Sequence, residues 1–490
     1  MKQISIFLVT AIALAAASAS ACTGFYAGKK TTVDGTVLIG RTVDVRPINA
    51  CFRLAIVPKG EADPLDGKDA PPAKYRFVCT PSLTSGGRGT FHSAAANERG
   101  LVVSGTVTGH SRAEIGKLDP CTHEEGDNWV GEHNLTGILA GQAATAREGV
   151  KVLGETIAHR KHTGQEIYML ADRNEAWYVE VYSTHQWAAV RMPEDKVACF
   201  GNQFMLRDFD PDSPDSMHSP ELVTMAERAG ILVRGADGKI DLCRTYSQPL
   251  SDYANLRTWY GHKVLAPSTA GEYVTTNAQP LFFSPDDKVS CTNLFELMRC
   301  RYEGSRWCPE EGGSGNVRTI GVTRQGTCHV ITLDSRLPDA CAGTIWVTLA
   351  NAEHSVFLPV NAAVTRLDPA YAADQLKPFR YDAALASCHF RRLCALAEKD
   401  RRLIGDGVRS YWRKREAELT AEYGSVLSAA ANGAVPDVRA LTDYCCRQQE
   451  RALADAKQIL DDVLWYLAAN NGTPGDGASS KPRPYSATGK

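Results

Sequence analysis

The chain has 490 residues, of which 43% are hydrophobic and 22% are charged, and its formal net charge is -2. This length exceeds a single average domain, so the composition predicts a globular protein with a large catalytic domain and an additional region. The near-neutral charge gives no electrostatic reason to expect nucleic acid as a partner. After the apolar segment of residues 4–17, no apolar stretch is long enough to span a membrane.

The chain begins with a segment that is typical of an export signal. Lys2 supplies a positive charge, residues 4–17 are almost continuously apolar, and residues 19–21 are the small residues that a signal peptidase needs. We therefore expect residues 1–21 to be a signal peptide and the protein to be periplasmic or secreted. Lipidation of Cys22 is the weaker alternative, because Ala19 replaces the Leu that usually stands three residues before a lipidated Cys.

Cleavage after Ala21 would make Cys22 the first residue, with a thiol and a free α-amine on the same residue. An α-amine has an ordinary pKa of about 7.7–8.0 and a thiol one of about 8.5, so the amine can accept the thiol proton near neutral pH. In the uncleaved chain this nitrogen is an amide and cannot act as a base, so cleavage would also activate the residue. The alternative interpretation is an ordinary cysteine that forms a disulfide.

The fifteen cysteines fit an oxidising compartment, and setting Cys22 aside leaves an even number for disulfide pairing. Cys445 and Cys446 are adjacent and are expected to form disulfides with different cysteines. The sequence does not fix the connectivity of the disulfides.

A hairpin is predicted directly after Cys22, because the Asp-Gly pair at residues 34–35 is a turn signal followed by an apolar strand. The returning strand carries Arg41 and Asp44. A loop of residues 28–35 would pair Arg41 with Cys22, and a tighter turn would move the partner of Cys22 further along the strand. Either register brings a guanidinium and a carboxylate close to the new N-terminus.

Strands and helices follow in an order that lacks regular βαβ alternation. Apolar spacing predicts helices at residues 135–162 and 289–303. Residues 97–108 are predicted to form a turn followed by a buried strand, and further strands are predicted at residues 167–170, 176–182, 187–191, 197–202, 319–322, 329–333 and 344–349. This order predicts an α+β layered fold built from antiparallel hairpins.

The pattern changes near residue 366. Residues 383–403, 408–423 and 438–469 are predicted to form long amphipathic helices, and residues 471–490 are rich in Gly, Pro and Ser and predicted to be disordered. The expected organisation is a signal peptide over residues 1–21, a catalytic domain over 22–365, a C-terminal helical region over 366–470 and a disordered tail over 471–490.

Several sequence blocks, taken in order, resemble the dipeptidase A family of cysteine N-terminal-nucleophile (Ntn) hydrolases, which is related to the secernins. They run from Cys22 to about residue 420 and read CTGFYAGKKTTVDGTVLIGRTVD, NERGL, TAREGVKVLGE, EAWYVE, the Asn-Gln of CFGNQF, KVSCTNLFELMRCRYEGS and GTIWVTLANAEHSVFLPV. The resemblance implies a four-layer αββα Ntn-hydrolase sandwich, a Cys nucleophile and the hydrolysis of dipeptides or other very short peptides.

The resemblance also implies roles for five residues. Cys22 would be the attacking thiolate, with Arg41 and Asp44 flanking it, Asn202 stabilising the tetrahedral oxyanion, and Arg257 as an active-site arginine. Each has a simpler interpretation when taken alone, namely a surface ion pair, a turn residue or a solvated cation. Related acylases carry a further oxyanion Asn where this chain has residues 104–107 without an Asn, so the second oxyanion donor is not assigned.

We expect neither a metal nor another cofactor. The candidate metal ligands His123, Glu124, Glu125, Asp127 and His133 do not have the spacing of a helical His-Glu-x-x-His site. The expected partners are short peptide substrates, without nucleic acid or a membrane span, and a homo-oligomer is compatible with the sequence.

The sequence therefore predicts an exported cysteine dipeptidase that acts through an acyl-enzyme. One alternative is an amidase of the same hydrolase group that acts on N-acyl amides, penicillins or bile salts. The other alternative, from a different functional class, is a disulfide-rich, lipidated surface protein without catalytic activity.

Overall fold

The computed structural model describes residues 21–45, 50–63, 71–84, 91–120, 129–313, 317–372, 381–432 and 436–469. The predicted tail lies outside these residues, as does all of the predicted signal peptide except Ala21.

Two antiparallel sheets form the centre of the molecule. The six-stranded sheet has the order β11 (Val197–Phe200), β1 (Ala21–Ala27), β2 (Val37–Asp44), β13 (Gln325–Leu333), β14 (Gly343–Thr348), β15 (Leu358–Asn361). The nine-stranded sheet has the order β12 (Ser216–His218), β10 (Trp187–Arg191), β9 (Ala176–Val181), β8 (Glu166–Ala171), β7 (Val102–Thr108), β6 (His92–Asn97), β5 (Phe77–Thr84), β3 (Ala50–Phe52), with β4 (Ala55–Val57) also pairing with β5.

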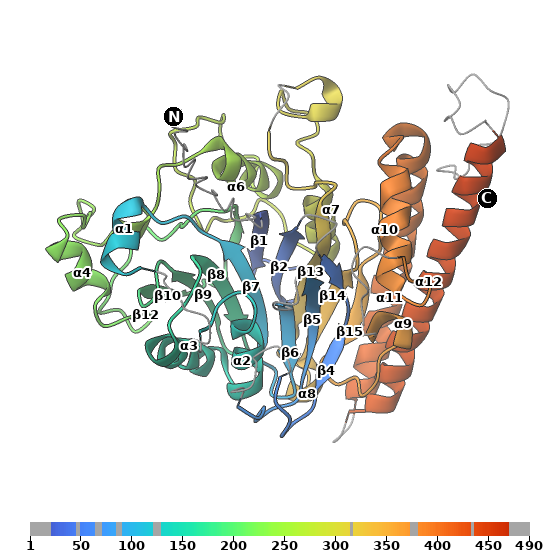
Figure 1. Ribbon diagram of the computed structural model, residues 1–490, viewed down its shortest axis with the longest axis horizontal. Helices are drawn as coiled ribbons and strands as arrows, with labels where there is room; N and C mark the ends of the chain where they lie inside the picture. Colours follow the sequence, from blue (N-terminus) through green and yellow to red (C-terminus); the bar gives the residue numbers. More distant parts are fainter. Residues whose placement is uncertain are drawn as a thin grey trace, which may run out of the picture.

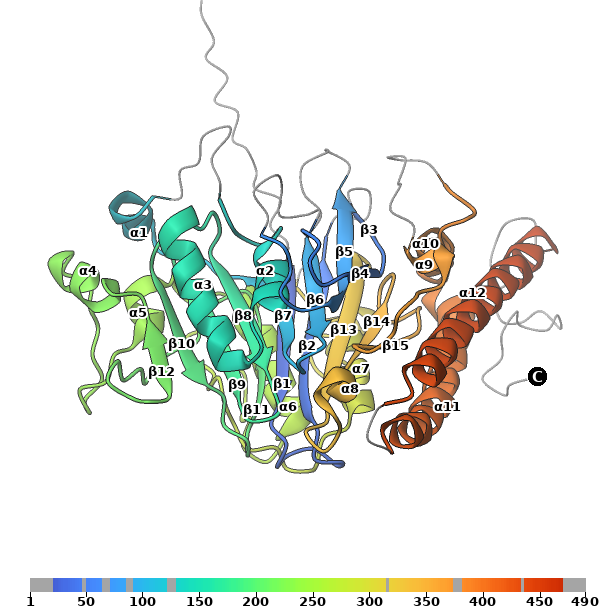
Figure 2. The ribbon, with the colours of Figure 1, turned by 90° about the horizontal axis from the view of Figure 1, so that it is seen from below.

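Helices cover the outer face of each sheet (Figure 1, Figure 2). Helices α2 (Leu135–Gln142) and α3 (Ala146–Arg160) pack on β6 to β9, whereas α6 (Asp252–Leu265) and α7 (Cys291–Arg299) pack on β11, β2 and β13. The inner faces of the two sheets contact each other, with β7 against β1 and β2 and with β6 against β14. The α+β, four-layer αββα prediction is confirmed.

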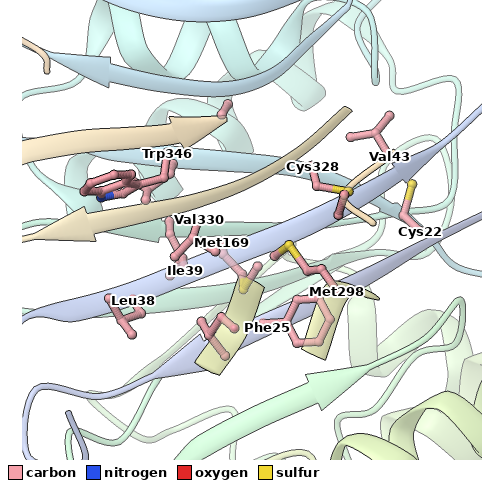
Figure 3. Packing of buried hydrophobic residues seen from close by; sticks show 14 of the residues in the cluster. Cys22, Phe25, Leu38, Ile39, Val43, Met169, Met298, Cys328, Val330 and Trp346 are labelled. Atoms are coloured by element: carbon pink, nitrogen blue, oxygen red, sulfur yellow. The ribbon is translucent and has the colours of Figure 1, made fainter. Parts of the chain in front are cut away.

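Alternation along the strands of the six-stranded sheet separates the two packing faces. Ile39 and Met169 belong to the main core, and a Cβ on Gly40 would lie 2.8 Å from the terminal methyl group of Met298 on α7 (Figure 3). Because successive side chains of a strand point to opposite faces, β2 presents its odd-numbered residues to one layer and its even-numbered residues to the other. This alternation decides where the functional side chains of β1 and β2 point.

The predicted helix over residues 135–162 is two helices. Ala143 has extended backbone after α2, and the Thr145 side chain accepts a hydrogen bond from the Glu148 backbone N–H to begin α3. A capping Thr favours a new helix start, which interrupts an otherwise continuous apolar pattern. Both helices bury leucine and isoleucine side chains in a second core cluster that also contains residues of β7 and β8.

Two further predictions about the central domain differ from the structure. Residues 319–322 form no strand, because the Thr319 side chain bonds to the Gly321 carbonyl in a turn before β13 begins. Helix α6 was not predicted, since its residues from Ala254 to His262 are all buried, polar ones as well as apolar ones, and do not separate into an apolar face and an exposed polar face. The shorter helices are α1 (Ala113–Leu118), α4 (Leu222–Arg228), α5 (Leu242–Tyr246), α8 (Asp339–Ala342), α9 (Pro369–Ala372) and the 3-10 turn η1 (Pro309–Glu311).

Three long helices pack at the edge of the sandwich that β15 forms (Figure 1). They are α10 (Ala386–Ala397), α11 (Asp406–Ala431) and α12 (Val438–Ala469). The predicted break near Gly405 is a π-helical turn, η2 (Arg401–Gly405), that leads directly into α11. Among the described residues, none of the helices combines the length and the apolarity needed to cross a bilayer.

The predicted disulfides are not found among the described cysteines. Thiols such as those of Cys199 and Cys328 are fully buried, and burial raises the pKa of both well above the ordinary value. A buried protonated thiol packs as a small apolar side chain. In the described part of the chain, the cysteines therefore contribute to the core rather than to covalent cross-links.

Candidate active site

The β1–β2 hairpin places the Cys22 sulfur next to the Arg41 guanidinium. Cys22 pairs with Val43, and Gly24 pairs with Arg41, so the register lies two residues beyond the one that a loop of residues 28–35 would give. A shift by two residues keeps a side chain on the same face of the sheet. Nη2 of Arg41 donates to Sγ of Cys22 at 3.1 Å, and both side chains are fully buried.

Glu132 holds Arg41 from the other side. Its Oε1 lies 3.1 Å from Nη2 of Arg41 and accepts a second hydrogen bond from the Thr106 hydroxyl at 3.0 Å. Burial lowers the pKa of Arg41, but the Cys22 sulfur and Glu132 oppose this and leave the pKa above its ordinary value. The sequence did not single out Glu132, because it is 91 residues from Arg41 and belongs to no local pattern.

Asp44 lies on the opposite face of β2 from Arg41. Its Oδ2 accepts hydrogen bonds from Arg318 and, at 3.4 Å, from the Thr42 hydroxyl. Burial raises the pKa of the Asp44 carboxyl, and the guanidinium groups of Arg318 and Arg257 oppose that shift. Arg318 was not predicted. In the sheet Asp44 pairs with Ala21, the residue that the expected cleavage would remove, so its flanking role stays a prediction.

Asn202 and Arg257 hold the backbone of Cys22. Oδ1 of Asn202 accepts from the Cys22 N–H at 3.1 Å and from Nη2 of Arg257 at 2.8 Å. Nη1 of Arg257 donates to the Cys22 carbonyl oxygen and, at 3.0 Å, to the Thr23 hydroxyl. Burial lowers the pKa of Arg257 to about 10. The Asn202 amide donates to the Thr108 carbonyl at 3.0 Å, and its oxyanion role stays a prediction.

The structure therefore holds the sulfur and the nitrogen of Cys22, the two atoms that the predicted mechanism would use. Arg41 contacts the sulfur, and Asn202 contacts the nitrogen. In the full-length chain this nitrogen is a peptide amide, and the Cys22 side chain is 0% exposed. An amide is not a base, so the arrangement can perform nucleophilic chemistry with its own amine only after the bond to Ala21 is cut.

His329 is a further titratable group on this face of the sheet. It pairs with Arg41 across β2 and β13, and its Nε2 lies 2.8 Å from the Ser104 hydroxyl. Burial and the neighbouring Arg41 lower its pKa well below the ordinary value. His329 is thus a neutral hydrogen-bonding group at the back of the site and adds no second cation next to Arg41.

One cluster in the described residues has the composition of a metal site. Glu353, His354 and Glu398 each bring a potential ligand atom within 4.8 Å of the others. Arg301 donates to both carboxylates, at 3.0 and 2.8 Å, and so does Arg401, at 2.8 and 3.0 Å. Guanidinium groups already neutralise these oxygens, so the cluster is an ion-pair network that joins α10 and η2 to the sandwich. The candidate ligands at residues 123–127 lie outside the described residues.

A cavity of about 1110 Å³ lies elsewhere, between α3, β10, β12 and α4. His185, Trp187 and Met217 belong to its lining, and Cys22 and Arg41 do not. The candidate active site is therefore defined by the chemistry of its side chains and not by this hollow.

Comparisons of the sequence with known proteins indicate one family. Residues 21–414 match the model described as "Peptidase family C69". The chain is 30% identical over 387 residues to a "Probable dipeptidase B" of Streptococcus pyogenes serotype M1, covering 74% of this chain and 76% of that protein. It is 27% identical over 383 residues to a "Probable dipeptidase" of Salmonella dublin, covering 75% and 87%. A mutant of the conjugated bile acid hydrolase from Clostridium perfringens aligns with 74% of this chain and 98% of its own, with 12% identity and a TM-score of 0.33.

Proposed function

The chain belongs to peptidase family C69, and on this premise we propose that it is an exported cysteine dipeptidase that hydrolyses dipeptides or very short peptides. The nucleophile in this proposal is the Cys22 sulfur. The observation that carries it is the pair of contacts on one residue, with Arg41 3.1 Å from the sulfur and Asn202 3.1 Å from the nitrogen. The relatives named as probable dipeptidases support the substrate class.

In the first half of the reaction, the α-amine of cleaved Cys22 takes the proton of its own thiol. The sulfur then bonds to the scissile carbonyl carbon, and the carbonyl electron pair moves to the oxygen. When this intermediate collapses, the carbon–nitrogen bond breaks and the ammonium of Cys22 returns its proton to the leaving amine. Arg41 favours the thiolate through a charge-assisted hydrogen bond, and Asn202 is the proposed donor to the oxyanion.

In the second half, water hydrolyses the thioester that joins the substrate acyl group to Cys22. The same α-amine takes a proton from the attacking water, the carbon–sulfur bond breaks, and the sulfur regains its proton. Asn202 and Arg257 keep the amine in place through both halves, because they bind the nitrogen and the carbonyl oxygen of this residue. Holding the base in one geometry removes most of the entropy cost of each proton transfer.

This proposal needs the removal of residues 1–21. The apolar leader and the small residues at 19–21 support cleavage after Ala21 and export to the periplasm or the medium. A lipid-anchored protein is the alternative outcome, and it would leave the Cys22 sulfur bonded to a lipid as a thioether and unable to attack. Mass spectrometry of the first peptide of the exported protein distinguishes a free Cys22 from a lipidated one.

A substrate panel with a nucleophile variant tests the activity. Dipeptides are assayed beside a penicillin and a conjugated bile salt, for the unmodified protein and for Cys22→Ser. We expect the unmodified protein to hydrolyse dipeptides most efficiently, and the variant to be exported and folded with almost no turnover. Near-normal activity of Cys22→Ser would exclude the mechanism, and preference for the penicillin or the bile salt would favour an amidase.

A further inference from the structure

Glu132 is a carboxylate inside the candidate site that the proposed mechanism does not use. Its side chain is 26% exposed, whereas that of Arg41, to which it is bonded, is 0% exposed. The Cys22 side chain is also 0% exposed in the uncleaved chain, so of these three groups Glu132 is the one with exposed surface. This difference separates the two partners of the ion pair into a buried cation and an accessible anion.

The distance from Glu132 to the nucleophile matches the size of an amino acid. The Cys22 sulfur and Oε1 of Glu132 each lie 3.1 Å from Nη2 of Arg41, so they are at most twice that distance apart. In a peptide with a free N-terminus, the α-nitrogen lies two bonds, about 2.5 Å, from the first carbonyl carbon. When that carbon is about 3–3.5 Å from the sulfur, the ammonium comes within hydrogen-bonding reach of the carboxylate.

The charges around Glu132 also favour a cation. Its backbone N–H donates to Oε1 of Glu166 at 3.2 Å, so a second carboxylate, whose Oε2 lies 3.2 Å from Nε2 of His162, is next to Glu132. Burial raises the pKa of Glu132, Arg41 opposes that shift, and Glu166 adds to it. Arg41 and Thr106 both donate to Oε1, while among the described residues none donates to Oε2. Oε2 is thus the available acceptor.

We propose that Glu132 is the subsite for the α-ammonium group of the substrate, and that it selects peptides with a free N-terminus. The inference rests on the proposed function and gives it a specificity determinant. An N-acylated peptide would place a neutral amide opposite this carboxylate. The carboxylate would then lose its bound water without gaining a positively charged partner, which is unfavourable. The site would then hydrolyse the first peptide bond of a substrate and not an internal one.

The test compares two substrates that differ by one group. The cleaved, mature enzyme and its Glu132→Gln variant are assayed on alanyl-alanine and on propionyl-alanine, in which hydrogen replaces the α-ammonium. Because a hydrogen bond between charged groups is involved, Glu132→Gln should lower kcat/KM for alanyl-alanine by about tenfold to a hundredfold. Any loss that comes from the contact between Glu132 and Arg41 should affect both substrates, so kcat/KM for propionyl-alanine should fall at least about tenfold less than kcat/KM for alanyl-alanine. An equal fall for both substrates would show that Glu132 only positions Arg41, and no fall for either would also overturn the inference.

Two further measurements keep this inference separate from the proposed function. Glu175→Gln is the matched control, because Glu175 pairs with Arg147 at 2.9 Å on the outer side of the nine-stranded sheet, and it should behave like the unmodified enzyme. Alkylation of Cys22 by iodoacetamide reports binding without turnover. Alanyl-alanine should protect Cys22 better than its N-acetylated form, and Glu132→Gln should remove this difference. An enzyme that shows this selective protection but hydrolyses no dipeptide would refute the proposed function alone, whereas equal protection by both peptides would refute the subsite.

Discussion

Replacing Arg318 with Met should destabilise the protein, because Arg318 is a partner of a buried carboxylate. Asp44 is 1% exposed and Arg318 is 7% exposed. Removing one member of a buried ion pair typically costs about 3–5 kcal/mol, since the other charge stays buried. The Thr42 hydroxyl remains 3.4 Å from Asp44, and the Arg257 guanidinium also acts on it, so we expect a loss near the lower value, about 3 kcal/mol.

The loss should depend on pH with a definite sign. Burial already raises the pKa of Asp44, and without Arg318 that pKa rises further. A carboxyl whose pKa is higher in the folded state favours folding when protonated, and this contribution is lost as the pH rises through the folded-state pKa. Arg318→Met should therefore be destabilised more at about pH 8 than at about pH 5.

Urea unfolding followed by tryptophan fluorescence measures this effect. The series contains the unmodified chain, Arg318→Met, Asp44→Asn and the double variant, in which an uncharged side chain replaces each partner. The double variant should be more stable than the sum of the single losses predicts. Arg228 pairs with Glu221 at 3.2 Å with both side chains more than half exposed, so Arg228→Met should change stability by less than about 1 kcal/mol. The reasoning would be refuted if Arg318→Met lost as little stability as Arg228→Met. It would also be refuted if the stability loss of the double variant equalled the sum of the two single losses.

Three other substitutions test separate parts of the structure. Arg41→Lys should lower kcat/KM for dipeptides by about tenfold to a hundredfold, because the shorter lysine side chain does not bring its ammonium to the position of Nη2, which donates to both Cys22 and Glu132; unchanged kinetics would contradict this. Burial raises the pKa of Glu180 to about 7, so the unmodified protein should lose stability relative to Glu180→Gln as the pH rises from about 4.5 to above 7, and a rise in relative stability would be the wrong sign. A Cβ on Gly24 would lie 2.2 Å from the Phe200 ring, so Gly24→Ala should cost about 1–3 kcal/mol in urea unfolding. Gly116 lies in α1 with no atom within 4 Å of an added Cβ, so Gly116→Ala should instead stabilise the protein, by up to about 1 kcal/mol.

Local sequence signals were sufficient for the parts of the site that one hairpin holds. The turn after Cys22 predicted that Arg41 would reach the thiol, and the structure brings them to 3.1 Å. The register differed by two residues, because loop length and not strand pattern sets it. The side chains still face the same way, since a shift by two residues preserves the face.

The parts that depend on distant residues were not predictable from a single sequence. Glu132 is 91 residues from Arg41, and Arg318 is 274 residues from Asp44. Each is a single charged residue outside any periodic segment. Its neighbouring residues therefore do not distinguish it from a charged residue on the protein surface. Helix α6, which carries Arg257, buries polar and apolar residues alike and therefore lacks the periodic signal that reveals surface helices.

The prediction of disulfides failed for a different reason. A cysteine count indicates the redox compartment only if the thiols are paired, and the described thiols are mostly buried singly in the core. Burial raises the pKa of Cys199 and Cys328, so these thiols should react slowly with alkylating agents. This difference in reactivity makes Cys22 distinguishable by chemical labelling.

The most direct measurement combines labelling with the identity of the first residue of the active enzyme. The purified, active protein is treated with limiting iodoacetamide, and its N-terminal peptide is then sequenced by mass spectrometry while residual activity is followed. We predict that the chain begins at Cys22 with an unblocked α-amine, and that activity falls in proportion to the label on its sulfur. An active preparation that begins at another residue, carries a blocked Cys22 nitrogen, or keeps its activity after the Cys22 sulfur is labelled would contradict the account.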